Sequence, residues 1–253
     1  MSLPHELLDE IFSYLSLHDR QDRQSLRNCS LVAKSWTNPS RRRLFKTVNI
    51  RGTTLRPWLD TIPPANDELL QHVRSFYVDC SVTWSNMNQP FHRIDVLQDY
   101  LPSFHQLQHL SLSYMHIPSD ISQRIEIFSA FRHTLSSFSI ARCNITISAL
   151  VTLINCFSNL DRLDLNHLLH EVDGESPSSL SRRLIRHLHI SDPNKDCLGI
   201  FNQLSELGLV VDELVVTSWS TCPPRAVSII ADSLGVNAKY IKLSRGGGFG
   251  VYT

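Results

Sequence analysis

The sequence predicts an α/β protein in which a short helical module, residues 1–43, precedes a curved strand–helix solenoid with a parallel sheet, residues 44–253. Two observations predict this fold class. Apolar residues recur at helical spacing in the first forty positions, and an apolar triplet recurs eight times at a nearly constant step in the remainder. With 42% hydrophobic residues among 253, the chain has enough apolar side chains to fold, which argues against a disordered protein.

The first predicted helix begins near Pro4, because proline fits the first turn of a helix, where its missing N–H costs nothing. Acidic residues near the positive end of this helix stabilise it, and the apolar residues that follow share one helical face. These apolar residues are Leu7, Leu8, Ile11, Phe12 and Leu15. The opposite face is polar and is expected to be exposed; it consists of Glu6, Asp9, Glu10 and Ser13.

A polar stretch, residues 16–24, interrupts the apolar pattern and offers His18, Asp19 and Asp22 as caps or loop residues. A second helical period follows at Leu26, Cys29, Val32, Ala33 and Trp36. Asn38-Pro39 is expected to end it, because proline disfavours the α conformation of the residue before it. Two or three such short helices bury little surface alone, so the module should contact a partner or the rest of the chain.

Within this module, residues 3–15 resemble the opening of an F-box, and residues 25–36 resemble its second half. The resemblance covers about 40 of 253 residues, although residues 18–24 are longer and more polar than the family's usual linker. It implies a three-helix module that binds the Skp-type adaptor of a cullin–RING ubiquitin ligase. The adaptor contacts that it implies are Leu3, Pro4, Leu8, Ile11, Leu15, Val32 and Trp36. The alternative is that this apolar stripe only packs on the following domain.

The remainder of the chain repeats the pattern apolar-x-x-apolar-x-apolar, with triplets starting at residues 45, 73, 107, 135, 160, 185, 211 and 238. The step between triplets varies only from 25 to 34 residues, which is typical of a solenoid. Each triplet ends with two apolar residues two positions apart, which predicts a short strand. Helical stripes follow several of the strands, as in residues 121–131, 147–157, 198–204 and 227–234.

Strand followed by helix at this step resembles the leucine-rich repeat. The best match is residues 135–145, in which Cys143 takes the position of the family's inward-facing asparagine or cysteine. Most other units lack that residue, so the repeats are degenerate. The resemblance implies parallel strands on a concave face and helices on a convex face.

Strand residues between the inward-facing apolar positions are expected to lie on that concave face and to form the candidate target-binding site. Its residues are His109, Arg162, Asp164, His187, His189, Glu213 and Tyr240. They offer charge-assisted hydrogen bonds and one large aromatic contact to a protein or peptide ligand. The alternative is that they are ordinary solvated strand positions.

Signals for catalysis or for a cofactor are weak. The glycine-rich residues 246–250 lack the lysine and the following helix of a phosphate-binding loop. His109, His187 and His189 lack the carboxylate or cysteine that would complete a metal site. No GxSxG or HExxH motif is present, so we expect no catalytic residue, no metal and no cofactor. Six cysteines without a CxxC pair are expected to be small buried hydrophobes, with a disulfide framework as the minority alternative.

Charge and hydropathy argue against some classes of binding partner and some cellular locations. The 24 basic and 24 acidic residues cancel, so no overall field favours nucleic acid or an acidic membrane surface. No run of eighteen apolar residues exists, and the first ten residues are too acidic for a secretory signal. We therefore expect an intracellular protein, cytoplasmic or nuclear. The basic triplet Arg41-Arg42-Arg43 is compatible with nuclear import or a phosphate contact, but a solvated helix end is the simpler interpretation.

Together these features predict a non-enzymatic substrate receptor of an SCF-type ligase, with the module on the adaptor and the repeats on a protein target. The alternative is a stand-alone leucine-rich-repeat-like interaction scaffold without a ligase role. Binding of the adaptor distinguishes the two.

Overall fold

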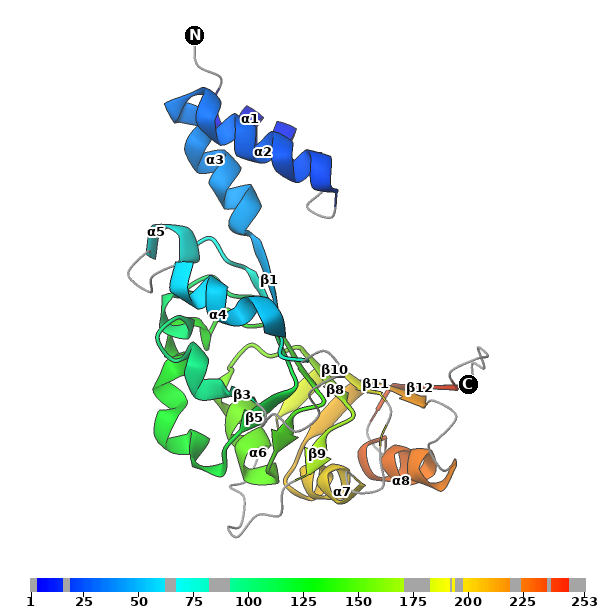
Figure 1. Ribbon diagram of the computed structural model, residues 1–253. Coiled ribbons are helices and arrows are strands. Elements are labelled where there is room, and N and C mark those ends of the chain that lie inside the picture. The colour runs from blue at the N-terminus through cyan, green and yellow to red at the C-terminus, as the bar shows by residue number, and fades with distance from the viewer. Residues whose placement is uncertain are drawn as a thin grey trace.

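The computed structural model describes residues 4–15, 19–61, 67–81, 92–170, 183–191, 193, 198–218, 224–235 and 238–245. Three helices form the N-terminal module and extend away from the rest of the molecule (Figure 1). They are α1 (His5–Ser13), α2 (Arg20–Val32) and α3 (Lys34–Phe45). A small core of Leu8, Phe12 and Leu26 holds them together.

The ends of these helices follow from local chemistry. The carboxylate of Asp19 accepts hydrogen bonds from the backbone N–H of Gln21 and Asp22, at 2.6 and 3.4 Å, which caps α2 as the sequence predicts. Ala33 then adopts an extended conformation and separates α2 from α3. The prediction that Asn38-Pro39 ends a helix is wrong, because Pro39 lies buried inside α3. The break comes earlier, at Ala33, and tertiary packing outweighs the local cost of the proline.

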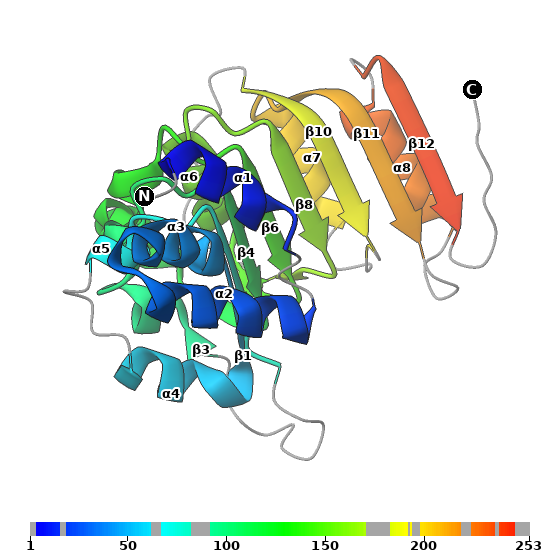
Figure 2. The same ribbon diagram turned by 90° about the horizontal axis from the view of Figure 1, so that it is seen from above.

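The large sheet contains eight strands within the described residues, all parallel and arranged in the order of the chain. Figure 2 shows that the sheet is curved and that its first and last strands, β1 and β12, do not meet to close a barrel. Its strands, in order, are β1 (Thr47–Arg51), β2 (Ser75–Asp79), β4 (His109–Ser113), β6 (Ser137–Ala141), β8 (Arg162–Asn166), β10 (Leu184–Ser191), β11 (Val210–Ser218) and β12 (Tyr240–Arg245).

The register of this sheet reproduces the step of the sequence pattern. The last two apolar positions of every triplet lie in a strand of the large sheet. Equivalent positions pair across neighbouring strands, as in Val48 with Phe76, Leu110 with Phe138, and Leu214 with Ile241. One repeat of the sequence therefore adds one strand to the sheet.

A second, smaller parallel sheet contains β3 (His92–Arg93), β5 (Met115–Ile117), β7 (Asn144–Ile145) and β9 (Leu169–His170). Before β5, β7 and β9, the chain leaves the large sheet through a residue in the left-handed conformation. These residues are Tyr114, Arg142 and His167, with φ of 57°, 51° and 44°. None is glycine, so each turn costs some free energy that packing of the following strand must offset.

Helical segments connect the strands. They are α4 (Gly52–Thr61), α5 (Asp67–Leu70), the 3-10 helices η2 (Ile94–Leu97), η3 (Leu101–Ser103) and η4 (Ser119–Phe131), and α6 (Ile147–Cys156), α7 (Leu198–Glu206) and α8 (Pro224–Leu234). The stripe expected at residues 121–131 is thus a 3-10 segment, kinked at Arg124. Figure 2 shows α7 and α8 behind the strands β10 to β12.

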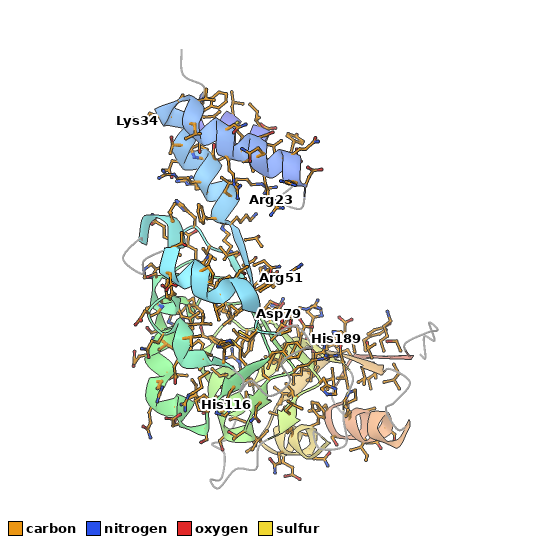
Figure 3. The ribbon with its side chains drawn as sticks, viewed as in Figure 1. Arg23, Lys34, Arg51, Asp79, His116 and His189 are labelled. Carbon is orange, nitrogen blue, oxygen red and sulfur yellow. The ribbon has the colours of Figure 1, made fainter. Side chains whose placement is uncertain are left out.

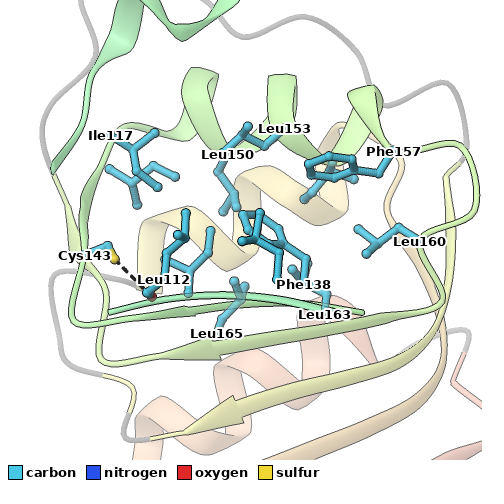
Figure 4. Packing of buried hydrophobic residues seen from close by; sticks show 14 of the residues in the cluster. Leu112, Ile117, Phe138, Cys143, Leu150, Leu153, Phe157, Leu160, Leu163 and Leu165 are labelled. Atoms are coloured by element: carbon cyan, nitrogen blue, oxygen red, sulfur yellow. Dashed lines mark hydrogen bonds between the residues drawn. The ribbon is translucent and has the colours of Figure 1, made fainter. Parts of the chain in front are cut away.

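The core lies between the large sheet and these helices. Phe157 is fully buried, and its ring centroid lies 5.7 Å from that of Phe128 and 5.4 Å from that of Phe138 (Figure 4). Cys143 is buried at the turn after β6, and its thiol donates to the carbonyl of Leu112 at 3.4 Å. Burial raises the pKa of Cys143 to about 12, so it behaves as a small hydrophobe, as predicted.

Candidate protein-binding surfaces

The helical module carries most of the large apolar side chains that are exposed. Five of the nine found among the described residues lie there. They are Leu7, Ile11, Tyr14, Leu31 and Val32, with exposed fractions of 46, 50, 80, 84 and 68%. We call these five residues the apolar patch. Several apolar side chains of this small module are thus exposed to water, a feature that favours contact with a protein partner.

The seven predicted adaptor contacts differ in exposure. Pro4, Ile11 and Val32 are exposed. Leu15 and Trp36 are half-buried and pack against the core of the module, where Trp36 meets the edge of Phe12 at 6.1 Å between ring centroids. Leu3 lies outside the described residues.

Leu8 requires a correction, because its side chain is fully buried and does not belong to an exposed stripe. The apolar residues in and just after α1 do not share one face, contrary to the prediction. A helix turns about 100° per residue, so Leu7, Ile11 and Tyr14 form one stripe, and Leu8, Phe12 and Leu15 form another. The second stripe builds the module, and the first faces solvent. The spacing of four and then three residues in each stripe was the signal that could have separated them.

The second surface is the face of the large sheet formed by the strand residues that alternate with the core positions. We call it the open face. The first row across it is Thr47, Ser75, His109, Ser137, Arg162, His187, Glu213 and Tyr240. The second row is Asn49, Tyr77, Ser111, Ser139, Asp164, His189, Val215 and Lys242. All seven predicted target-binding residues therefore lie in two adjacent rows.

A third row continues the open face by the same alternation. It consists of Arg51, Asp79, Ser113, Ala141, Asn166, Ser191, Thr217 and Ser244. The triplet pattern did not indicate this row, because the pattern ends at the last apolar residue of each strand. Extending every strand by one further alternation predicts these positions.

A hydrogen-bond network joins the rows between β8 and β12. Arg162 donates to both oxygens of Asp164, at 2.9 and 3.0 Å. Nδ1 of His189 lies 3.4 Å from the same carboxylate, and its Nε2 lies 3.1 Å from the hydroxyls of both Ser191 and Thr217. These contacts fix the orientation of the imidazole across three strands (Figure 3 labels His189 on this face).

Asp164 is the electrostatic centre of this network. Partial burial alone would raise its pKa, but the hydrogen bonds from His189 and Arg162 and their charges outweigh burial, so the pKa of Asp164 lies below its ordinary value. Nearby, Nδ1 of His187 lies 2.6 Å from the Glu213 carboxylate. The network thus presents a fixed set of donors and acceptors, which is what polar recognition of a protein requires.

His109 and Tyr240 stand apart from the network. Both are exposed in the first row, and neither makes a side-chain hydrogen bond within the described part of the chain. His109 lies on β4 and is separated from His187 on β10 by two intervening strands, so the three histidines do not converge. In the ranges that the structure describes, no three His, Cys, Asp or Glu side chains gather as metal ligands do, and no helix is long and apolar enough to cross a membrane.

Comparison with known proteins bears on the helical module. A family model described as F-box-like matches residues 1–51, a range that contains α1, α2, α3 and β1. The comparison with curated proteins gives no match. The match agrees with the residues that carry the resemblance and with the three-helix arrangement. The N-terminal part of this chain is an F-box-like domain.

Proposed function

We propose that this chain is a non-catalytic substrate-recognition subunit of an SCF-type cullin–RING ubiquitin ligase. Its F-box-like domain binds the Skp-type adaptor, and the sheet that follows binds a protein target. The observation that carries the proposal is the match of residues 1–51 to an F-box-like family, on a module whose exposed side chains include the apolar patch.

The adaptor contact is proposed for the exposed members of the module. Ile11 and Val32 are half or more exposed in the isolated chain, so a partner groove that covers them removes apolar surface from water. Full burial of an exposed aliphatic side chain is worth about 1.5–3 kcal/mol, and covering the part of Ile11 and Val32 that is still exposed contributes the corresponding fraction of it. Leu8, Leu15 and Trp36 serve this contact by shaping the module, and Pro4 extends it at the start of α1.

For the target, we propose that residues 44–253 form a leucine-rich-repeat-like solenoid whose open face is the concave recognition surface. The parallel strands in chain order and the one-strand step per repeat support this proposal. The target is centred near Arg162, His187 and Glu213. These side chains form a continuous row across β8, β10 and β11, and Tyr240 on β12 extends the row with an aromatic ring.

The test is co-purification of the adaptor with the full chain and with Ile11→Asp/Val32→Asp. These two substitutions place carboxylates on the apolar patch, where contact with a partner would bury them without compensation. Adaptor recovery should fall by at least about tenfold, a free-energy change of about 1.4 kcal/mol or more. Leu184→Asp is a matched control, because Leu184 lies on β10 and is 49% exposed.

Circular dichroism checks that each variant stays folded. Equal adaptor recovery by the folded double variant and the wild type would refute the proposed contact. Failure of the wild-type chain itself to bind any Skp-type adaptor would favour the stand-alone scaffold.

A further inference from the structure

A cavity of about 980 Å³ lies between the F-box-like module and the start of the sheet. Residues of α1 and α3 form one wall, and residues from the end of α5 to the start of β2, with Gln106, form the other. Six cationic side chains line it: Lys34, Arg41, Arg42, Arg43, Lys46 and Arg74. The acidic residue among its lining side chains is Asp9. We call this cavity the basic groove.

Three of the cations, Lys34, Arg41 and Arg42, lie along one face of α3 together with two polar residues. Lys34, Thr37, Asn38, Arg41 and Arg42 follow the helical spacing that brings residues to the same side. From Lys34, the first residue of α3, to Lys46, the residue that caps its end, the chain rises by about 18 Å, at about 1.5 Å per residue. Each end of the groove therefore carries positive charge, which a single small ion could not contact simultaneously.

The two walls of the basic groove are connected by the backbone. The amides of Arg74 and Ser75 donate to the carbonyl of Lys46, at 2.9 and 3.0 Å. This contact joins the end of α3 to the start of β2 and brings the side chains of Lys46 and Arg74 to the same cavity. The basic groove is thus built by the fold from two separate segments of the chain.

Most of this positive charge is not neutralised within the described residues. Arg42 approaches Asp9 at 3.8 Å, but the two side chains are 55 and 49% exposed, so their attraction is weak. Arg43 donates to the carbonyls of Ser13 and Leu15, while its buried Nε has no partner.

In the same described ranges no carboxylate lies within 4 Å of Lys34, Arg41, Lys46 or Arg74. The pKa of His72, in the facing wall, lies below its ordinary value, first through burial and then through the charge of Arg42. The groove therefore keeps a positive field despite the neutral net charge of the chain.

We propose that the basic groove binds an extended acidic segment of a partner protein. Charge complementarity along about 18 Å of helix fits a chain of carboxylates better than a compact anion. Nucleic acid fits less well, because the aromatic residue lining the groove, Phe12, is only 2% exposed and offers no ring for base stacking. The proposal does not depend on adaptor binding, which uses the apolar patch.

The test measures fluorescence anisotropy of three labelled probes against the full chain at about 50 mM and about 300 mM NaCl. The probes are a peptide of eight glutamates, a peptide of eight glutamines and an oligothymidylate of eight nucleotides. The glutamate peptide should bind at least about tenfold more tightly than the other two, and its affinity should fall at the higher salt concentration. Lys34→Glu/Arg41→Glu should weaken it by at least about tenfold.

Arg23→Glu/Arg27→Glu is the matched control, since it makes the same charge change on α2 outside the groove. Figure 3 shows Lys34 and Arg23 at opposite ends of the module. This control should bind the glutamate peptide within about twofold of wild type, and thermal melting confirms that both variants are folded. The proposal is overturned if the glutamine peptide binds equally well, if the two double variants behave alike, or if oligothymidylate binds more tightly than the glutamate peptide.

Discussion

Leu8 and Ile11 are three residues apart on α1, yet Leu8 is completely buried and Ile11 is 50% exposed. Leu8 packs with Phe12 and Leu26 in the core of the module. Ile11 belongs to the apolar patch. A single short helix therefore supplies both internal packing of the F-box-like domain and exposed apolar surface.

Leu8→Ala should destabilise the module by about 2–5 kcal/mol, because the substitution leaves a cavity in a core of very few residues. Ile11→Ala should change the stability by less than about 0.5 kcal/mol, because its side chain is half in solvent. Native-state hydrogen exchange of the α1–α3 amides measures both effects. Unchanged protection in Leu8→Ala would contradict the assignment of Leu8 to the core.

Asp164→Asn should make the protein less stable at neutral pH by about 1 kcal/mol, because it removes the charge that pairs with Arg162 and His189. The folded pKa of Asp164 is lowered, so the carboxylate contributes stability above its ordinary pKa of 3.8. That contribution disappears as the pH falls through the folded pKa. Urea unfolding from pH 7 to pH 3 should show the two proteins converging at the acidic end. A difference that grows toward low pH would contradict this reasoning.

Cys80 and Cys143 should resist alkylation in the folded protein, because burial is the main factor that raises the pKa of each thiol to about 12. Cys29 is half-buried and should be labelled faster. Iodoacetamide labelling at pH 8, followed by mass spectrometry of the peptides, measures each rate. In denaturant all three should react, and protection that persists there would have another cause.

Replacing Arg162, His187, His189 and Tyr240 together by alanine should remove the protein target while leaving the adaptor bound. These residues supply the donors and the aromatic contact of the open face. The control replaces Ser122, Gln123, Glu126 and Ser129, four exposed positions of η4, by alanine. Quantitative proteomics of bound partners separates the two outcomes. Retention of every non-adaptor partner by the first variant would exclude this face.

The sequence predicted the large sheet well, because its strands are specified by a strong local signal. Positions such as Leu110 and Leu112 alternate with polar residues and recur at a regular step. The alternation predicts a strand and shows which of its side chains face the core, and the step predicts which strands pair. The small sheet was not predicted, because strands of two residues, such as Asn144–Ile145, carry no periodicity of their own. They exist through pairing with equivalent segments in neighbouring repeats.

The candidate surfaces were predicted less completely. The rows of the open face follow from alternation, so His187 and His189 were placed correctly on it. The network around Asp164 depends on side-chain directions across three strands, which no local pattern encodes. The basic groove needs two walls that are distant in the sequence, and tertiary contacts such as the hydrogen bond between Lys46 and Arg74 bring them together. The basic triplet on α3 alone could not indicate it.

The order of the strands has a consequence for how the chain folds. Each ladder of the large sheet joins residues 25 to 34 positions apart, from Leu163 with Leu188 to Phe76 with Leu110. The contact order of the protein is therefore low for a sheet of this size. Each added strand closes a loop of similar length, so the entropic cost of loop closure is similar for every strand. Folding can begin at any pair of adjacent strands and can then add neighbouring strands on both sides. The outermost strands, which have a neighbour on one side only, should be the first to unfold on heating.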